Sequence, residues 1–130
     1  MNHKKILAIF IVAFILNVLW ENLHSQLYLH YQGGTITQLI LLRATLFDAM
    51  FISILLFATE KIKFLTHHKI FWIATIAVIS AILIEVYAIS TNRWAYGPAM
   101  PLIPLLNVGL TPTIQLALLS IITHQVTKKM

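Results

Sequence analysis

Four long apolar runs dominate the chain, and short segments richer in polar residues separate them. The runs cover about residues 6–28, 36–59, 70–90 and 108–126. An α-helix needs roughly 20 mostly apolar residues to cross the hydrocarbon core of a bilayer, and each run comes close to that length. The pattern therefore predicts an all-α integral membrane protein, in which residues 1–130 form one bundle of four transmembrane helices.

The segments between the runs differ in character. Residues 32–35 contain two consecutive glycines, which favour a tight turn. Residues 60–69 form a short polar loop. Residues 92–107 are longer and largely apolar, with a proline at every third position from Pro98 to Pro104. We expect this proline-rich segment to be either a lid or re-entrant stretch over the outer end of the bundle, or an ordinary interfacial loop.

The basic residues indicate an orientation for the bundle. With four spans, seven lysines fall on one side of the membrane, and the two arginines belong to the other half of the bundle. The lysines are Lys4, Lys5, Lys61, Lys63, Lys69, Lys128 and Lys129, and the arginines are Arg43 and Arg93. Because positive residues concentrate in cytoplasmic loops, both termini are predicted to be cytoplasmic. We expect the membrane to be the cytoplasmic (inner) membrane of a prokaryote.

Composition supports this assignment and excludes several classes of function. Hydrophobic residues make up 59% of the chain and charged residues 10%, whereas a soluble domain carries about 25% charged residues. There is no cysteine, which excludes disulfides, thiolate metal sites and CxxC redox chemistry. The net charge of +5 does not indicate nucleic-acid binding, because the basic residues lie at the ends of apolar runs and form no stripe. A homo-oligomer or a larger membrane complex stays open.

Three of the four acidic residues, Glu21, Asp48 and Glu85, lie inside predicted helices. A charged group in hydrocarbon costs several kcal/mol, so such residues usually face the interior of a bundle. At about 1.5 Å per residue, all three fall between the midplane and the outer surface. The same half of the bundle contains His24, Arg43, Arg93, Asn107 and Gln115. We therefore expect one polar cluster that opens toward the outside or the outer leaflet.

Helical spacing groups some of these side chains. Asn17, Glu21, His24 and Tyr28 follow one another at intervals of three or four residues, which places them on one face of a helix. Glu85 shares a face with small residues, which let a neighbouring helix approach closely. Glu21 and His24 also have the Glu-x-x-His spacing of carboxylate metal sites in helical bundles. Those sites normally use two such motifs, so a hydrogen-bonded pair is the favoured interpretation and a metal the alternative.

The cluster predicts a division of roles. Glu21, His24, Asp48 and Glu85 are candidate catalytic residues, because carboxyl and imidazole groups transfer protons. The candidate substrate-binding residues are Arg43, Arg93, Trp94, Tyr96, Asn107 and Gln115. The two arginines are suited to hold an anionic head group. Alternatively, they neutralise the buried acids or extend to the lipid head groups. No particular cofactor is indicated.

One segment resembles part of a known family. Between Glu85 and Pro112, residues Thr91, Arg93-Trp94, Tyr96 and Gly109 follow an acidic helix. This arrangement resembles the acidic-helix-then-aromatic-loop segment of carotenoid hydratase-type membrane proteins. The resemblance covers less than a quarter of the chain and does not assign a family. It implies chemistry on an apolar isoprenoid or lipid.

Three classes of function remain. The first is a small membrane enzyme or lipid-binding protein that acts by acid–base chemistry on a lipid or isoprenoid-like substrate at an outer-leaflet site. The second is a non-catalytic membrane subunit or assembly factor, in which the same polar cluster is structural. The third is a small proton-coupled carrier, for which four helices leave little room. We favour the first class because so many kinds of polar side chain converge at one depth.

Overall fold

The computed structural model describes all residues from 1 to 130, and most of them are helical. The helices are α1 (His3–His24), α2 (Gln38–Lys61), α3 (Lys63–Thr66), α4 (Lys69–Ser90) and α5 (Leu110–Thr127). By length and composition, three of them, α1, α2 and α4, are long and apolar enough to cross a membrane. The fold is therefore compatible with a multi-pass membrane protein.

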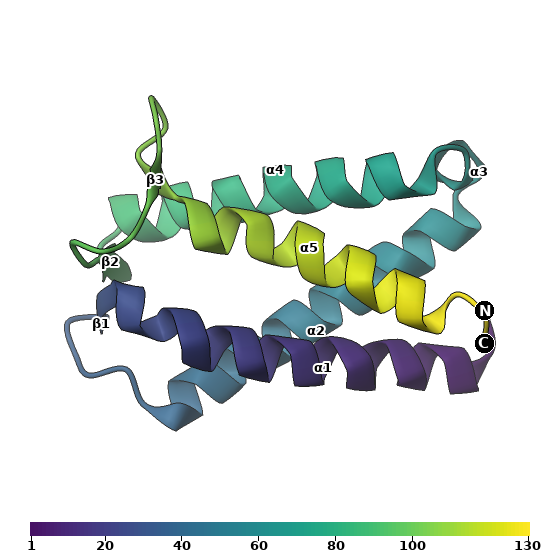
Figure 1. The fold of residues 1–130 in the computed structure, drawn as a ribbon, viewed down its shortest axis with the longest axis horizontal. Helices are drawn as coiled ribbons and strands as arrows, with labels where there is room; N and C mark the ends of the chain where they lie inside the picture. The colour runs from purple at the N-terminus through teal and green to yellow at the C-terminus, as the bar shows by residue number, and fades with distance from the viewer.

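Helices α1, α4 and α5 run along the length of the molecule, and α2 crosses behind them at an angle (Figure 1). Helix α1 packs closely against α2, and α4 packs closely against α5. Helix α5 also contacts α1 and so joins the two pairs. Both chain termini lie at one end of the bundle, and the short strands lie at the other end (Figure 1).

The core is built from alanines and branched aliphatic residues. Ala13, Ala49, Ile52, Ile73 and Ala77 are completely buried within one hydrophobic cluster. Alanine at these positions lets the helix backbones approach closely, as is common in membrane helix packing. Many large apolar side chains remain exposed on the outside of the bundle, among them Leu19, Leu23, Ile54 and Leu83. Such extensive apolar exposure is typical of a surface that contacts lipid.

Helix α5 is the most central helix, and it differs from the other long helices in its polar content. Thr113, Ser120, Thr123 and Thr127 on this helix are all buried. The three threonine hydroxyls donate to the carbonyl oxygen one turn earlier, at 2.7–2.8 Å. The three threonine hydroxyls are thus satisfied within the helix, whereas the hydroxyl of Ser120 is buried without a hydrogen-bond partner. This explains how a helix with this composition can occupy the centre of an otherwise apolar bundle.

Several predicted boundaries were wrong. The first helix ends at His24, so Tyr28 does not continue its face; a 3₁₀ turn, η1 (Ser25–Leu27), and strand β1 (Tyr28–Tyr31) follow it. The polar loop at 60–69 contains α3. The proline-rich segment is not a uniform loop, since it contributes β2 (Trp94–Tyr96) and β3 (Leu102–Ile103), with β4 (Val108–Gly109) just after it.

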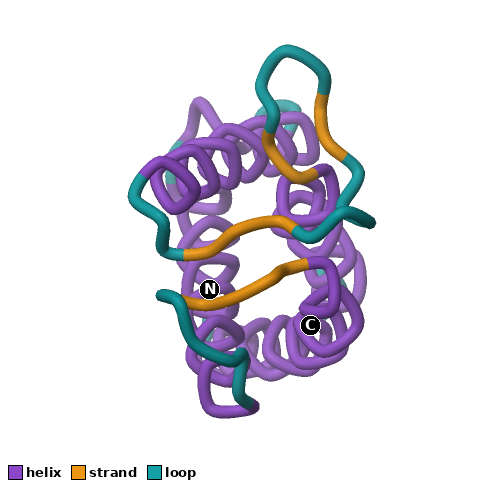
Figure 2. Tube along the Cα trace, turned by 90° about the vertical axis from the view of Figure 1, so that its left-hand side faces the viewer, coloured by secondary structure: helices purple, strands orange, loops and turns teal.

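The strands form two small antiparallel ribbons that helical periodicity does not predict. Strand β1 pairs with β2, opposing Tyr28 to Tyr96 and Tyr31 to Trp94. Seen along the bundle, the β1–β2 ribbon lies across its end (Figure 2). Strands β3 and β4 form a second ribbon that projects from the same end (Figures 1 and 2). The β1–β2 ribbon is the element that covers the candidate site.

Candidate functional site

A cavity of about 570 Å³ lies next to the β1–β2 ribbon, inside the end of the bundle that carries the strands. Its walls come from α1, α2, α4, α5 and the ribbon, and 13 of its 23 lining residues are hydrophobic. Three acidic side chains, Glu21, Asp48 and Glu85, also line this mostly apolar cavity. The sequence predicted one polar cluster containing these acids, and all three line this cavity.

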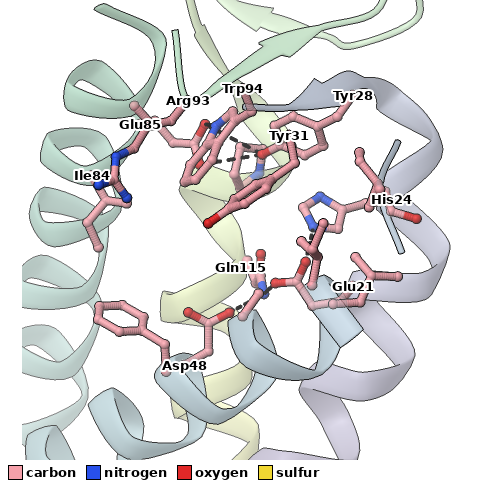
Figure 3. Close-up of a pocket in the computed structure, with 18 of the residues that line it drawn as sticks. Glu21, His24, Tyr28, Tyr31, Asp48, Ile84, Glu85, Arg93, Trp94 and Gln115 are labelled. Carbon is pink, nitrogen blue, oxygen red and sulfur yellow. Dashed lines mark hydrogen bonds and ion pairs between the residues drawn. The ribbon is translucent and has the colours of Figure 1, made fainter. Parts of the chain in front are cut away.

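Gln115 connects two of the acids (Figure 3). Its amide nitrogen Nε2 lies 2.8 Å from Glu21 Oε1 on α1 and 2.9 Å from Asp48 Oδ2 on α2. The same nitrogen is 3.0 Å from Oδ1 of Asn17, which is one turn before Glu21 on α1. Gln115 is buried on α5, so one side chain links three helices.

This cluster contains more acceptors than donors. A glutamine amide nitrogen carries two hydrogens, so Nε2 can donate to only two of its three oxygen neighbours at once. The amide nitrogen of Asn17 makes no hydrogen bond to the acids; its Nδ2 donates to the carbonyl oxygen of Ala13 at 2.7 Å. The wall formed by Glu21 and Asp48 is therefore suited to bind a proton or to accept a hydrogen bond from a ligand.

His24 forms a hydrogen-bonded pair with Glu21. Nε2 of His24 is 3.1 Å from Glu21 Oε2, and Nδ1 is 3.4 Å from the hydroxyl of Thr111 on α5. Both side chains are buried, and they are three residues apart on α1. A hydrogen on Nε2 would donate to the carboxylate and leave Nδ1 as an acceptor. This is the geometry of a carboxylate that orients an imidazole for proton transfer.

Glu85 has a different environment. Its carboxylate accepts from Tyr96 Oη at 2.7 Å, from Trp94 Nε1 at 3.0 Å and from Tyr28 Oη at 3.4 Å. Both strands of the β1–β2 ribbon therefore bind to one residue of α4, as Figure 3 shows for Tyr28 and Trp94. Glu85 makes no hydrogen bond with Glu21 or Asp48. With three donors already in place, Glu85 anchors the ribbon over the cavity.

The arginines do not neutralise the buried acids. The close acid–base contacts of the structure are Lys5 with Glu60, at 2.7 Å, and the hydrogen-bonded pair of His24 and Glu21, and neither involves an arginine. Arg43 and Arg93 both line the cavity, and both are exposed. The guanidinium of Arg93 lies over the ring of Tyr87, 5.5 Å from its centroid. Both positive groups thus remain free to meet a negatively charged group at the edge of the cavity.

The structure brings together most of the residues proposed from sequence. The cavity is lined by Glu21, His24, Arg43, Asp48, Glu85, Arg93, Trp94 and Gln115. Tyr96 is not a lining residue but contacts the site through Glu85. Asn107 is exposed between β3 and β4 and does not line the cavity. The structure contains no group of three or more His, Asp or Glu side chains placed to hold a metal ion.

Four of the lining residues that were not predicted as site residues are aromatic side chains. Tyr28 was placed on the first helix, whereas it reaches Glu85 from β1. Tyr31 packs its ring against Trp94 across the ribbon, with centroids 6.3 Å apart. Phe47 and Tyr87 also line the cavity. Phe47 lies one residue before Asp48, which is the only signal in the sequence that could have drawn attention to it.

Comparison of the chain with protein-family models, with curated proteins and with solved structures finds no match. The functional argument therefore rests on the cavity itself. Its chemistry is that of an apolar chamber whose wall carries a Glu21–His24 pair, with Asp48 joined to Glu21 through Gln115.

Proposed function

We propose that the chain is a multi-pass protein of a prokaryotic inner membrane with four spans, formed by α1, α2, α4 and α5. Helix α5 has 18 residues and is therefore about 27 Å long, which approaches the thickness of the hydrocarbon core. The position of both termini at one end of the bundle also supports an even number of spans (Figure 1). The lysine distribution then places both termini in the cytoplasm.

Reporter fusions test this topology. Fusions after Lys129 and within 60–69 should both report a cytoplasmic location, because these segments carry the lysines. A fusion at Ala99, between β2 and β3, should report the opposite side. A C-terminal fusion that reports an external location would contradict four spans, and it would also reverse the assignment of the cavity to the outer half.

In this orientation the cavity lies in the outer half of the membrane. We propose that it binds a lipid or isoprenoid-like molecule and acts on it by acid–base chemistry. The observation that carries the proposal is the Glu21–His24 pair, buried beside Asp48 in a cavity with mostly apolar lining. Such a lining favours an apolar ligand, and the few polar groups that converge on it fix the ligand's orientation.

The residues of the pair have complementary tasks. The carboxylate of Glu21 holds the imidazole of His24 through Nε2, at 3.1 Å. Proton transfer to or from a bound molecule then uses the acceptor-rich wall of Glu21 and Asp48, with His24 as the neighbouring proton carrier. Gln115 positions both carboxyl groups by donating to each of them. Exclusion of water by the apolar lining strengthens these interactions.

Lipid analysis of cells that produce the protein tests this activity. Wild-type protein should change the abundance of one apolar species relative to cells without it. His24→Ala should abolish that change, because general acid–base residues contribute about 10²–10⁴-fold to rate. His67→Ala, in the exposed segment after α3, is the matched control and should behave as wild type. If the lipid profiles of His24→Ala and His67→Ala cells departed equally from that of wild type, the result would argue against a role for the Glu21–His24 pair.

One observation favours a second function. Gln115 bonds to side chains of α1 and α2 from its position on α5, and such a buried network also fixes helix register. The chain would then be a non-catalytic subunit or assembly factor. In that case the lipid profile would not depend on His24, whereas the thermal stability of the protein would still depend on Gln115.

A further inference from the structure

Only four of the residues that line the cavity are exposed, and they mark its mouth. Arg43 and Phe47 belong to α2; Tyr87 belongs to α4, and Arg93 follows shortly after that helix. Phe47 is 55% exposed and Tyr87 is 57% exposed, although both contribute to the cavity wall. The mouth therefore opens between α2 and α4, with one arginine and one aromatic ring on each side.

The packing of the bundle explains why the mouth is at the side. The β1–β2 ribbon lies across the end of the bundle, and Glu85 anchors it there (Figures 2 and 3). The pairs α1–α2 and α4–α5 pack tightly, whereas α2 and α4 touch only slightly. A long apolar molecule thus has its route in through the α2–α4 gap, where Phe47 and Tyr87 are exposed beside the two arginines.

We propose that the ligand is an amphiphile with an anionic head group, a phosphate or a carboxylate, which enters sideways from the outer leaflet between α2 and α4. Arg43 and Arg93 hold the head at the mouth, and the apolar chain passes Phe47 and Tyr87 into the cavity. This inference rests on the proposed function and specifies its substrate class.

The distribution of charge fixes the direction of binding. Arg43 lies five residues after the start of α2, about 8 Å along the helix, and Arg93 lies three residues after the end of α4. Both are close to the end of the bundle, where a lipid head group would be. Asp48 lies ten residues after the start of α2, about 15 Å along the helix, and its negative charge would repel an anionic head. The part of the ligand that reaches the acidic wall is therefore its neutral chain.

The arginines have the chemistry that this role requires. Arginine presents a planar fork of donors that matches phosphate and carboxylate. Neither arginine is paired with an acid of the chain, so an incoming head group does not have to displace an internal partner. The ring of Tyr87 beneath the guanidinium of Arg93 holds that group at the mouth.

A binding titration on the purified full-length chain tests the inference. Trp20→Phe and Trp72→Phe leave Trp94, which lines the cavity, as the only tryptophan, so that its fluorescence reports occupancy. The probes are farnesyl phosphate, oleate, farnesol and inorganic phosphate. We expect both anionic amphiphiles to bind at least about tenfold more tightly than farnesol, since hydrogen bonds to charged groups contribute strongly. Inorganic phosphate alone should leave the fluorescence unchanged.

Variants of the arginines separate this inference from the proposed function. Arg43→Gln/Arg93→Gln should weaken the binding of farnesyl phosphate about tenfold or more and alter farnesol binding less than about twofold. Arg43→Lys/Arg93→Lys should retain part of the affinity, because the charge is kept. Lys63→Gln/Lys129→Gln removes the same amount of charge at two exposed sites that do not line the cavity. This variant should bind as wild type.

The outcomes are distinct. Equal affinity for farnesol and farnesyl phosphate would overturn the anionic head group and leave an apolar ligand site standing. Binding of inorganic phosphate as tight as that of farnesyl phosphate would overturn the amphiphile. Failure of every amphiphile to change Trp94 fluorescence would contradict both the inference and the proposed function.

Discussion

Gln115→Leu should destabilise the protein more than any other single substitution at the site. The change keeps the approximate volume of the side chain but removes the nitrogen that donates to Glu21 and Asp48 at 2.8 and 2.9 Å. The buried carboxyl group of Glu21 and the partly buried one of Asp48 would then lie near each other without that donor. The free energy of unfolding should fall by about 3 kcal/mol or more, because an uncompensated buried charge is costly. The thermal midpoint in detergent should fall by roughly 10 °C.

Two further variants show whether the lost donor is the cause. Gln125→Leu, on the exposed surface of α5, makes the same chemical change and should shift the midpoint little. Gln115→Leu combined with Glu21→Gln should recover part of the stability, because the new amide supplies N–H donors beside Asp48. If Gln115→Leu and Gln125→Leu unfolded at the same temperature, the link between the three helices would have no energetic importance.

Glu85→Leu should release the β1–β2 ribbon from α4. The substitution leaves Trp94 Nε1 and the hydroxyls of Tyr28 and Tyr96 without their common acceptor. The free energy of unfolding should fall by about 2 kcal/mol, since a mostly buried polar group left without a hydrogen-bond partner costs about 1–3 kcal/mol. Amide hydrogen exchange in β1 and β2 should accelerate, and Trp94 should become more accessible to an aqueous quencher.

The effect should be local. Glu60→Gln removes a carboxylate at the other end of α2, where Glu60 pairs with Lys5, and should leave exchange in the ribbon unchanged. Glu85→Gln retains one acceptor oxygen, so its ribbon should be intermediate between wild type and Glu85→Leu. Unchanged exchange in β1 and β2 of Glu85→Leu would show that strand pairing alone holds the ribbon, and that Glu85 is free for another role.

The helices could be predicted because their signal is long and simple. The run predicted at 70–90 differs from α4 by one residue, since a continuous apolar stretch between polar loops fixes both of its ends. The depth of Glu21, Asp48 and Glu85 followed from the rise of a helix per residue, and the three acids do line one cavity. Glu21 and His24 were also correctly expected to pair, because three residues separate them on one helix.

The ribbon could not be predicted, because its cause is a contact between distant segments. Residues 28–31 follow the first apolar run, which was predicted to end at about residue 28, and they form a strand through pairing with residues 94–96. The three donors to Glu85 come from this ribbon, so helical spacing alone could not identify them. The mouth of the cavity could not be predicted for the same reason, since the packing of α2 and α4 brings Phe47 and Tyr87 to one opening.

Native mass spectrometry of the full-length protein, extracted from membranes in mild detergent, tests the central claim most directly. A cavity that binds a specific apolar ligand predicts one additional mass on wild-type protein, at close to one molecule per chain. Ala44→Trp fills the cavity from α2 and should lose that mass, whereas Ala58→Trp, on the same helix but away from the cavity, should keep it. Protein without any bound molecule, or with a mixture of lipids that both variants retain equally, would contradict the claim.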